Sequence, residues 1–176
     1  MKLTLSRSVV RSWTVDDLGS LVKYADNRKI WLNLRDRFPH PYTRRDGREF
    51  IQLARSQRPP TMFAIEVDGE AAGGIGFVQH VDVERVSAEI GYWLGEPFWG
   101  RGIVSEALVA VTKYAIETHH LTRVFAVPYA HNEGSCRVLE KAGYVLEGRL
   151  RRSAIKDGQI VDQMQYAFTS EANPTA

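Results

Sequence analysis

Apolar residues recur along the chain at two spacings, which separate expected helices from expected strands. Spacing of three or four residues runs through residues 15–25 and 43–54. Thr14 with Asp17, and Thr43 with Asp46, stand at the starts of these runs, a pattern typical of a helix N-terminus. Residues 26–37 are ambiguous and favour one further helical turn. Residues 38–42 should be extended, because each proline disfavours helix in the residue before it.

The other runs predict a sheet. Strands are expected at residues 3–13, 62–67, 71–79 and 87–94. Asp68-Gly69 predicts a tight hairpin between the second and third of these, and the glycines at 73, 74 and 76 predict a bulge or bend. The remaining expected elements are a helix over 102–118, a strand over 123–127, a short helix over 133–141, and strands over 144–150 and 160–168 around an Asp157-Gly158 turn.

Composition is typical of one globular domain. The chain has 176 residues, of which 44% are hydrophobic and 25% charged, with a formal net charge of +2. This charge is too small to argue for a specific nucleic-acid partner. The single cysteine, Cys136, excludes an internal disulfide, and no segment approaches the roughly 20 apolar residues of a membrane helix. We therefore expect a cytoplasmic protein that does not associate with a membrane, with one domain over residues 1–170 and a disordered tail at 171–176.

The stretch from residue 88 to residue 108 predicts a strand, a glycine-bearing turn and a helix. The first amides of such a helix have no partner inside it, and the helix dipole favours an anion there. Gly100 and Gly102 leave room for a phosphate to approach the backbone, and Arg101 adds positive charge. A plain tight turn is the alternative. Ser105 stands where a dinucleotide fingerprint needs its third glycine, and no P-loop sequence is present.

Two blocks resemble the GNAT superfamily of N-acetyltransferases. The first block is Trp99-Gly100-Arg101-Gly102-Ile103-Val104, which is similar to the family's acyl-CoA-binding signature Gln/Arg-x-x-Gly-x-Gly/Ala. The second is Asn132-Glu133-Gly134-Ser135 followed by Leu139-Glu140-Lys141-Ala142-Gly143-Tyr144, in the family's order and separation. The Trp-Gly-basic-Gly pattern resembles the branch that includes ribosomal-protein N-terminal acetyltransferases. Val104 departs from the signature's Gly/Ala.

The resemblance implies an α/β (α+β) GNAT fold, in which about four helices flank a mixed, splayed sheet of about seven strands. It also implies acetyl-CoA as co-substrate, with no metal. By the same resemblance, the backbone near Trp93 and Leu94 pairs with the pantetheine arm. The residues that this assigns to cofactor binding are Trp93, Leu94, Trp99, Gly100, Arg101, Gly102, Ile103, Val104, Ser105 and Asn132.

Two residues are candidates for catalysis by the same resemblance. Glu89 is the candidate general base, acting on the amine through water; the alternative is a solvated strand glutamate. Some relatives place their glutamate on the penultimate strand, where this chain has Ala154. Ser135 is the candidate proton donor to the leaving thiolate, since Leu139 stands where many GNAT enzymes carry a tyrosine. The alternative is a structural hydrogen bond.

Other residues have both a binding and a structural interpretation. Asn132 either caps the short helix or binds the pantetheine amide, and both can hold. Trp31, Phe38 and Tyr42 lie in the region where the family builds its acceptor pocket, although core packing is the commoner fate of aromatic residues.

The sequence thus predicts an enzyme that transfers an acetyl group from acetyl-CoA directly to a primary amine. The expected acceptor is an α-amine, on a protein N-terminus or an amino-acid-like compound. The alternatives are a small-amine acetyltransferase, for polyamines or aminoglycosides, and a CoA-binding regulatory protein without catalysis. A homodimer is left open.

Overall fold

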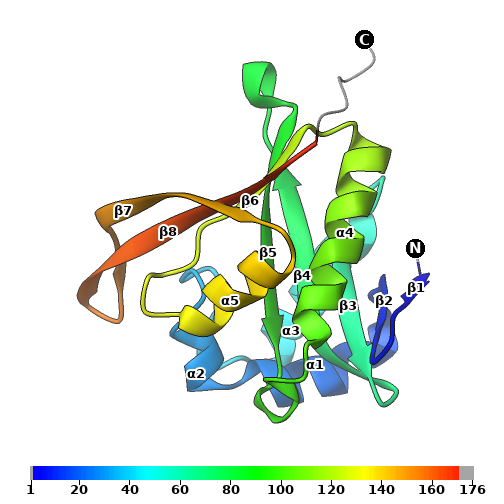
Figure 1. Ribbon diagram of the computed structural model, residues 1–176. Coiled ribbons are helices and arrows are strands. Elements are labelled where there is room, and N and C mark those ends of the chain that lie inside the picture. Colours follow the sequence, from blue (N-terminus) through cyan, green and yellow to red (C-terminus); the bar gives the residue numbers. More distant parts are fainter. Residues whose placement is uncertain (1, 171–176) are drawn as a thin grey trace. The chain divides into compact units, whose positions relative to one another are not determined.

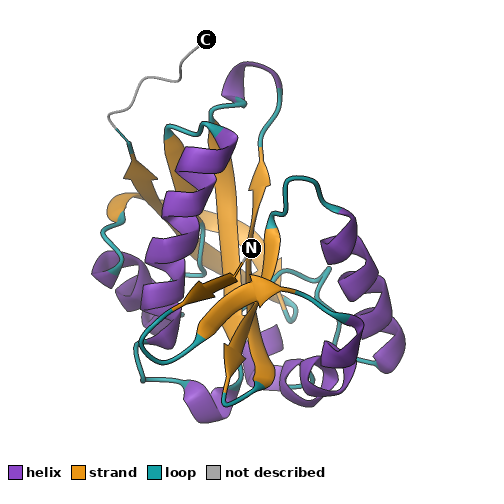
Figure 2. Cartoon of the chain, turned by 90° about the vertical axis from the view of Figure 1, so that its right-hand side faces the viewer, coloured by secondary structure: helices purple, strands orange, loops and turns teal. Residues whose placement is uncertain are grey.

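The computed structural model describes residues 2–170, so the tail expected at 171–176 lies outside the described residues. The chain folds into two compact units. Unit 1 holds residues 2–76 and 92–107, and unit 2 holds residues 77–91 and 108–170. Both units combine helices with strands; Figure 2 colours the helices purple and the strands orange. Within the described residues, no helix is both long enough and apolar enough to cross a membrane.

The elements follow the expected order with two additions (Figure 1). In unit 1 they are β1 (Lys2–Thr4), β2 (Val9–Ser12), α1 (Leu18–Ala25), α2 (Arg28–Trp31), α3 (Arg44–Ser56) and β3 (Met62–Val67). Three elements have residues in both units: β4 (Glu70–Gln79), β5 (Ser87–Leu94) and α4 (Ile103–His119). In unit 2 they are β6 (Arg123–Ala126), α5 (Glu133–Lys141), β7 (Val145–Lys156) and β8 (Gln159–Thr169).

The described strands form a mixed sheet in the order β1-β2-β3-β4-β5-β6-β8-β7. β5 pairs parallel with β6, whereas β3 pairs antiparallel with β4 and β7 with β8. The predicted mixed α/β class is confirmed, with eight strands instead of about seven and five α-helices instead of about four among the described residues. The ambiguous segment supplies the additional helix, α2, which Asn27 caps by accepting a 2.8 Å hydrogen bond from the Lys29 amide.

The prediction of one strand over residues 3–13 is wrong. This segment is a hairpin of β1 and β2, in which Lys2 lies opposite Arg11 and the Leu5 amide donates to the Ser8 carbonyl at 2.9 Å. The physical reason is local: the polar residues Ser6, Arg7 and Ser8 between the two apolar runs favour a turn over a continued strand. This turn contacts the start of α4 in the same unit, through hydrogen bonds from Ser6 to Glu106.

The last strand pair is also longer than predicted. β7 continues through residues 151–156 to the Asp157-Gly158 turn, and its register with β8 shifts between Leu150 and Ala154. The Arg152 amide leaves the ladder there and donates instead to Asp162 Oδ1 at 2.7 Å. The Asp162 carboxylate on β8 therefore stabilises the register shift in β7. No apolar pattern in the sequence marks this shift.

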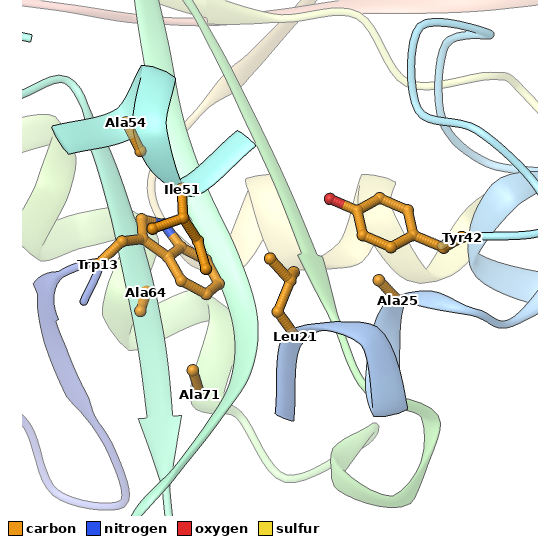
Figure 3. Packing of buried hydrophobic residues seen from close by; sticks show 8 residues of the cluster. All are labelled: Trp13, Leu21, Ala25, Tyr42, Ile51, Ala54, Ala64 and Ala71. Atoms are coloured by element: carbon orange, nitrogen blue, oxygen red, sulfur yellow. The ribbon is translucent and has the colours of Figure 1, made fainter. Parts of the chain in front are cut away.

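Unit 1 has a core between its helices and strands. Trp13 and Leu21 are at most 2% exposed, and Phe50 packs edge-on against Trp13 with ring centroids 5.3 Å apart. Figure 3 shows eight residues of the cluster, which come from the segment after β2, from α1, the segment before α3, α3, β3 and β4: Trp13, Leu21, Ala25, Tyr42, Ile51, Ala54, Ala64 and Ala71. This core fixes α1 and α3 against the first strands.

In unit 2, β7 and β8 run side by side as a long hairpin (Figure 1). Leu139 of α5 and Val124 of β6 are fully buried. The buried Thr112 of α4 and Tyr144, which precedes β7, share a hydrogen bond of 2.6 Å between their hydroxyls. Burial of the apolar side chains and pairing of the polar ones together hold α5 in place.

One charged residue in unit 1 is almost fully buried. Asp17 is 6% exposed and accepts two hydrogen bonds from the Arg11 guanidinium, at 2.7 and 2.8 Å. Burial opposes ionisation of this carboxyl, but the bonds from Arg11 and the Thr14 amide outweigh it and hold the pKa of Asp17 below its ordinary value. The ion pair should therefore stabilise the folded state at neutral pH.

We expect Asp17→Asn to lower the free energy of unfolding by about 2 kcal/mol at pH 7. Because the folded-state pKa is lowered, this stabilisation is present above about pH 4 and is lost as the pH falls through the folded-state value. Urea unfolding at pH 7 and pH 3 should thus show a smaller difference between variant and parent at pH 3. Asp16→Asn, at the exposed neighbour, is the control; an equal effect of both substitutions would contradict the assignment.

Candidate active site

The predicted cofactor turn lies in unit 1 between β5 and α4. Gly100 and Gly102 have φ angles of +75° and +77°, in the left-handed region that favours glycine. Apart from the glycine itself and its two chain neighbours, no heavy atom of residues 2–170 lies within 4 Å of the place where a Cβ would stand on either residue. The turn therefore requires glycine for its backbone, and it leaves open space where the sequence predicts an approaching phosphate.

The amides at the start of α4 have the properties of an anion site. The first hydrogen bond into the helix runs from the Glu106 amide to the Gly102 carbonyl at 3.2 Å. Within residues 2–170, the amides of residues 103–105 donate to no protein group. The helix is 17 residues long, so its dipole adds partial positive charge at this end. These amides can bind a phosphate.

Trp99 connects this turn with the end of β5. Its indole Nε1 donates to the Leu94 carbonyl at 2.6 Å, while the residue remains 45% exposed. On the preceding 3-10 turn (Glu96–Phe98), the Glu96 carboxylate accepts hydrogen bonds from Asn27, at 2.9 Å, and from Lys29. Side chains therefore fix the segment between β5 and α4 through Glu96 and through Trp99, and the bonds to Glu96 connect this segment with the start of α2.

The strand end at Trp93 and Leu94 lies close to β4. A Cβ on Gly73 would come within 2.5 Å of the Trp93 carbonyl oxygen, and one on Gly74 within 2.8 Å of the Trp93 indole nitrogen. The predicted irregularity occurs here, since the register of β3 with β4 shifts beside Gly73. The Leu94 carbonyl already accepts a hydrogen bond from the Trp99 indole, so fewer backbone groups at this strand end are available to pair with a pantetheine arm.

The predicted acceptor residues in unit 1 have different surroundings. Tyr42 is 4% exposed within the core, and burial raises the pKa of its hydroxyl. Phe38 packs against Tyr42 at 4.9 Å and against Trp93 at 5.8 Å between ring centroids. Trp31 is half-buried, with the Arg28 guanidinium 5.5 Å from its ring centroid. Phe38 therefore links the predicted acceptor segment to the predicted cofactor strand, a contact that the sequence did not indicate.

The predicted base lies in unit 2. Glu89 is on β5, half-buried, with Phe125 of β6 as its Cα partner. Its neighbours Ala88 and Ile90 are at most 2% exposed, so strand alternation directs the Glu89 side chain to the opposite face of the sheet. Asp162 of β8 is a less suitable base than Glu89, because it accepts hydrogen bonds from the Arg152 amide and from the Arg149 guanidinium, and these contacts hold its pKa below the ordinary value.

Ser135 and Asn132 lie together at the start of α5 in unit 2. Asn132 caps the helix, because its Oδ1 accepts from the Ser135 amide at 3.1 Å. The cap interpretation of Asn132 is therefore confirmed, and its role toward pantetheine stays a prediction. Ser135 is half-buried on the first helical turn. The next residue, Cys136, has its pKa raised mainly by burial, which argues against a reactive thiolate.

A pocket on another face of α5 was missed by the sequence analysis. It has a volume of about 680 Å³ and is lined by α5, by β7 and β8, and by the loop before α5. Its lining includes Cys136, Arg137, Arg149 and Tyr166, and the Tyr166 hydroxyl donates to Glu140 at 2.9 Å. The signal that could have found it is the spacing of Glu133, Cys136, Arg137 and Glu140 along one helix face.

Comparison with known proteins identifies the class. Residues 7–145 match the family model of the acetyltransferase (GNAT) domain. The chain belongs to the GNAT acetyltransferases. It is 31% identical, over 97% of its length and 91% of the relative's, to the ribosomal protein uS5-alanine N-acetyltransferase of Escherichia coli.

Solved structures agree with this assignment. RimL, a ribosomal L7/L12 α-N-protein acetyltransferase in complex with coenzyme A, superposes with a TM-score of 0.85 at 23% identity, covering 98% of this chain and 100% of that one. RimJ of Mycobacterium smegmatis, in complex with a CoA disulfide, gives a TM-score of 0.78 at 27% identity, covering 96% of this chain and 85% of that one. The predicted GNAT fold and N-acetyltransferase class are confirmed.

Proposed function

We propose that this N-acetyltransferase uses acetyl-CoA and acetylates the α-amine of a protein N-terminus or of an amino-acid-like compound. In this reaction the amine nitrogen attacks the thioester carbonyl carbon and gives up a proton to a base, the carbon–sulfur bond breaks, and the departing thiolate takes up a proton to become the thiol of CoA. The assignment of acetyl-CoA as the acetyl donor rests on the turn at Gly100 and Gly102. This turn has open space beside it, and the first amides of the following helix donate to no group within residues 2–170.

The fit of this turn to a diphosphate rests on its chemistry. Adjacent amides at a helix N-terminus supply several donors to phosphate oxygens at once, and the dipole adds to their effect. The Arg101 guanidinium contributes a positive charge from the same turn, 5.4 Å from the Phe98 ring centroid. Solved relatives of the same fold bind CoA or acetyl-CoA, which supports the donor.

The acceptor assignment has support of a different kind. The E. coli relative acts on the alanine of a ribosomal protein, and RimL acetylates an α-amine. A half-buried glutamate on β5 can accept a proton from an ammonium group, directly or through water. We assign this role to Glu89, and we assign protonation of the leaving thiolate to the Ser135 hydroxyl.

A small-amine acetyltransferase is the second candidate. The aromatic side chains Trp31 and Phe38 favour it as much as they favour a peptide, because aromatic faces bind ammonium groups in general. A CoA-binding protein without catalysis would retain the turn and need neither Glu89 nor Ser135.

The experiment that tests the proposal is a screen for thiol release from acetyl-CoA in the presence of individual amines. Peptides with a free α-amine, spermidine and an aminoglycoside form the panel, and mass spectrometry locates the acetyl group. Release stimulated by a free α-amine supports the proposal. Release stimulated only by spermidine or the aminoglycoside would support the second candidate, and CoA binding with no release would indicate a binding protein.

We expect Gly102→Glu to weaken acetyl-CoA binding at least about tenfold. A side chain at this φ angle strains the turn, and its carboxylate would repel the phosphates. Isothermal titration calorimetry measures the affinity, and circular dichroism checks the fold. Gly91→Ala, at a glycine with open surroundings and ordinary φ, is the control. Unchanged affinity in a folded Gly102→Glu protein would remove the turn from the cofactor site.

A further inference from the structure

Within unit 1, the turn between β1 and β2 contacts both the glycine turn before α4 and the first turn of α4. The Arg7 guanidinium donates through Nη1 to the Arg101 carbonyl at 2.8 Å. Ser6 donates twice to the Glu106 carboxylate, from its hydroxyl at 2.5 Å and from its amide at 3.2 Å. These bonds join residues about one hundred positions apart in sequence, so the N-terminal hairpin is attached to the phosphate-binding turn proposed above.

The two contacts change the electrostatics of that turn in the same direction. Glu106 lies in the first turn of α4, where its negative charge would repel an anion at the neighbouring amides. Its two bonds from Ser6 hold the carboxylate toward the hairpin and disperse its charge. Arg7, which is exposed, places a second guanidinium beside the backbone of Arg101. The hairpin thus binds the carboxylate of Glu106 in the first turn of α4, and it adds the positive charge of Arg7 beside the glycine turn.

The same contacts also restrict a backbone that contains two glycines. Gly100 and Gly102 flank Arg101, and glycine loses more conformational freedom on ordering than any other residue. Fixing the carbonyl between them orders the turn before a ligand arrives, which reduces the entropy lost on binding. Arg7 can therefore strengthen anion binding by its position as well as by its charge.

We propose that Arg7 is a positioning residue for the diphosphate of coenzyme A, and that Ser6 assists it by holding Glu106. This inference rests on the proposed use of acetyl-CoA. The N-terminal hairpin carries none of the predicted site residues. In this proposal it orders the turn from Gly100 to Gly102 and adds positive charge beside it.

The test compares ligands that do and do not carry the diphosphate. Calorimetry gives the affinities of CoA and of pantetheine for the parent protein and for the Arg7→Ala, Arg7→Lys and Lys2→Ala variants. We expect Arg7→Ala to bind CoA at least about fivefold more weakly, with pantetheine binding unchanged. Arg7→Lys keeps a charged donor and should recover part of the loss. Lys2→Ala removes the same charge from the same hairpin and should match the parent.

The outcomes separate the two proposals. If the parent does not bind CoA, the proposed function fails. If the parent binds CoA and Arg7→Ala binds it equally well, or loses affinity for CoA and pantetheine alike, the role of Arg7 is refuted while the proposed function stands. Should Arg7→Ala unfold, Arg7→Gln, which retains a donor for the Arg101 carbonyl but no charge, serves in its place.

A second measurement tests the part played by Ser6. Ser6→Ala removes the shorter bond to Glu106 and should weaken CoA binding about twofold to threefold. Adding Glu106→Gln to this variant removes the charge that Ser6 had held, so affinity should return to the parent value or exceed it. Failure of the second substitution to restore affinity would show that Ser6 does not act through Glu106.

Discussion

Glu89→Gln should lower turnover with a free α-amine acceptor by about 100-fold or more, because general-base catalysis contributes about that factor or more. Glutamine keeps the size of the side chain on β5 but cannot take up a proton. The Michaelis constant for acetyl-CoA should change little, since none of the proposed diphosphate contacts involves Glu89. Turnover of the variant should rise with pH, as deprotonation of the amine by solvent takes over.

The control for this prediction is Ser135→Ala, which affects the other end of the reaction. It should slow departure of the thiolate, and it should leave the pH dependence of amine deprotonation close to that of the parent. Pre-steady-state and steady-state thiol release over pH 6 to 9 measures both effects. Parental turnover in both variants would show that the two residues are structural, and a solvent network would then have to remove the amine proton.

The sequence predicted best those features that depend on neighbouring residues. Thr43 and Asp46 form the expected reciprocal cap of α3, with the Thr43 amide 2.8 Å from the Asp46 carboxylate. The Asp68-Gly69 and Asp157-Gly158 pairs make the expected turns, since all four residues have positive φ. The turn at Gly100 and Gly102 was predicted for the same reason, because its conformation is dictated by glycine itself.

What the sequence did not predict depends on contacts between distant segments. The packing of Phe38 on Trp93 has no local pattern, because it needs the tertiary fold to bring its partners together. The same holds for Arg7 and Arg101. Because a single strand was predicted over residues 3–13, the turn that carries Arg7 was not expected. The β1–β2 hairpin and the bond from Arg7 to Arg101 were therefore missed for the same reason.

Contacts between distant segments converge on the C-terminal end of β5 and on the segment that follows it. Phe38 reaches this region from the loop before α3, Asn27 from the cap of α2, and Arg7 from the N-terminal hairpin. Three segments that contribute no catalytic residue in the proposal therefore fix the backbone that would hold the donor. Precision in such a site comes from supporting contacts as much as from the residues that bind.

We expect a peptide with a free α-amine to be acetylated about 100-fold faster, at pH 7, than an N-terminally blocked peptide with one lysine. An α-amine with a pKa near 8 is about one tenth deprotonated at this pH, whereas a lysine amine with a pKa of about 10.4 is only about 0.04% deprotonated. With Glu89 as the single proposed base, acting through water, the enzyme has little means of offsetting that difference.

The comparison uses two peptides of equal length and charge, one beginning with a free alanine and lacking lysine, the other N-acetylated and carrying a central lysine. Thiol release at pH 7 and pH 9 gives the kcat/KM for each. The ratio between the two peptides should narrow at pH 9, because the deprotonated fraction of the α-amine approaches saturation while that of lysine rises about 100-fold. Faster acetylation of the blocked peptide at pH 7, or of spermidine, would overturn the α-amine assignment and leave the N-acetyltransferase class unchanged.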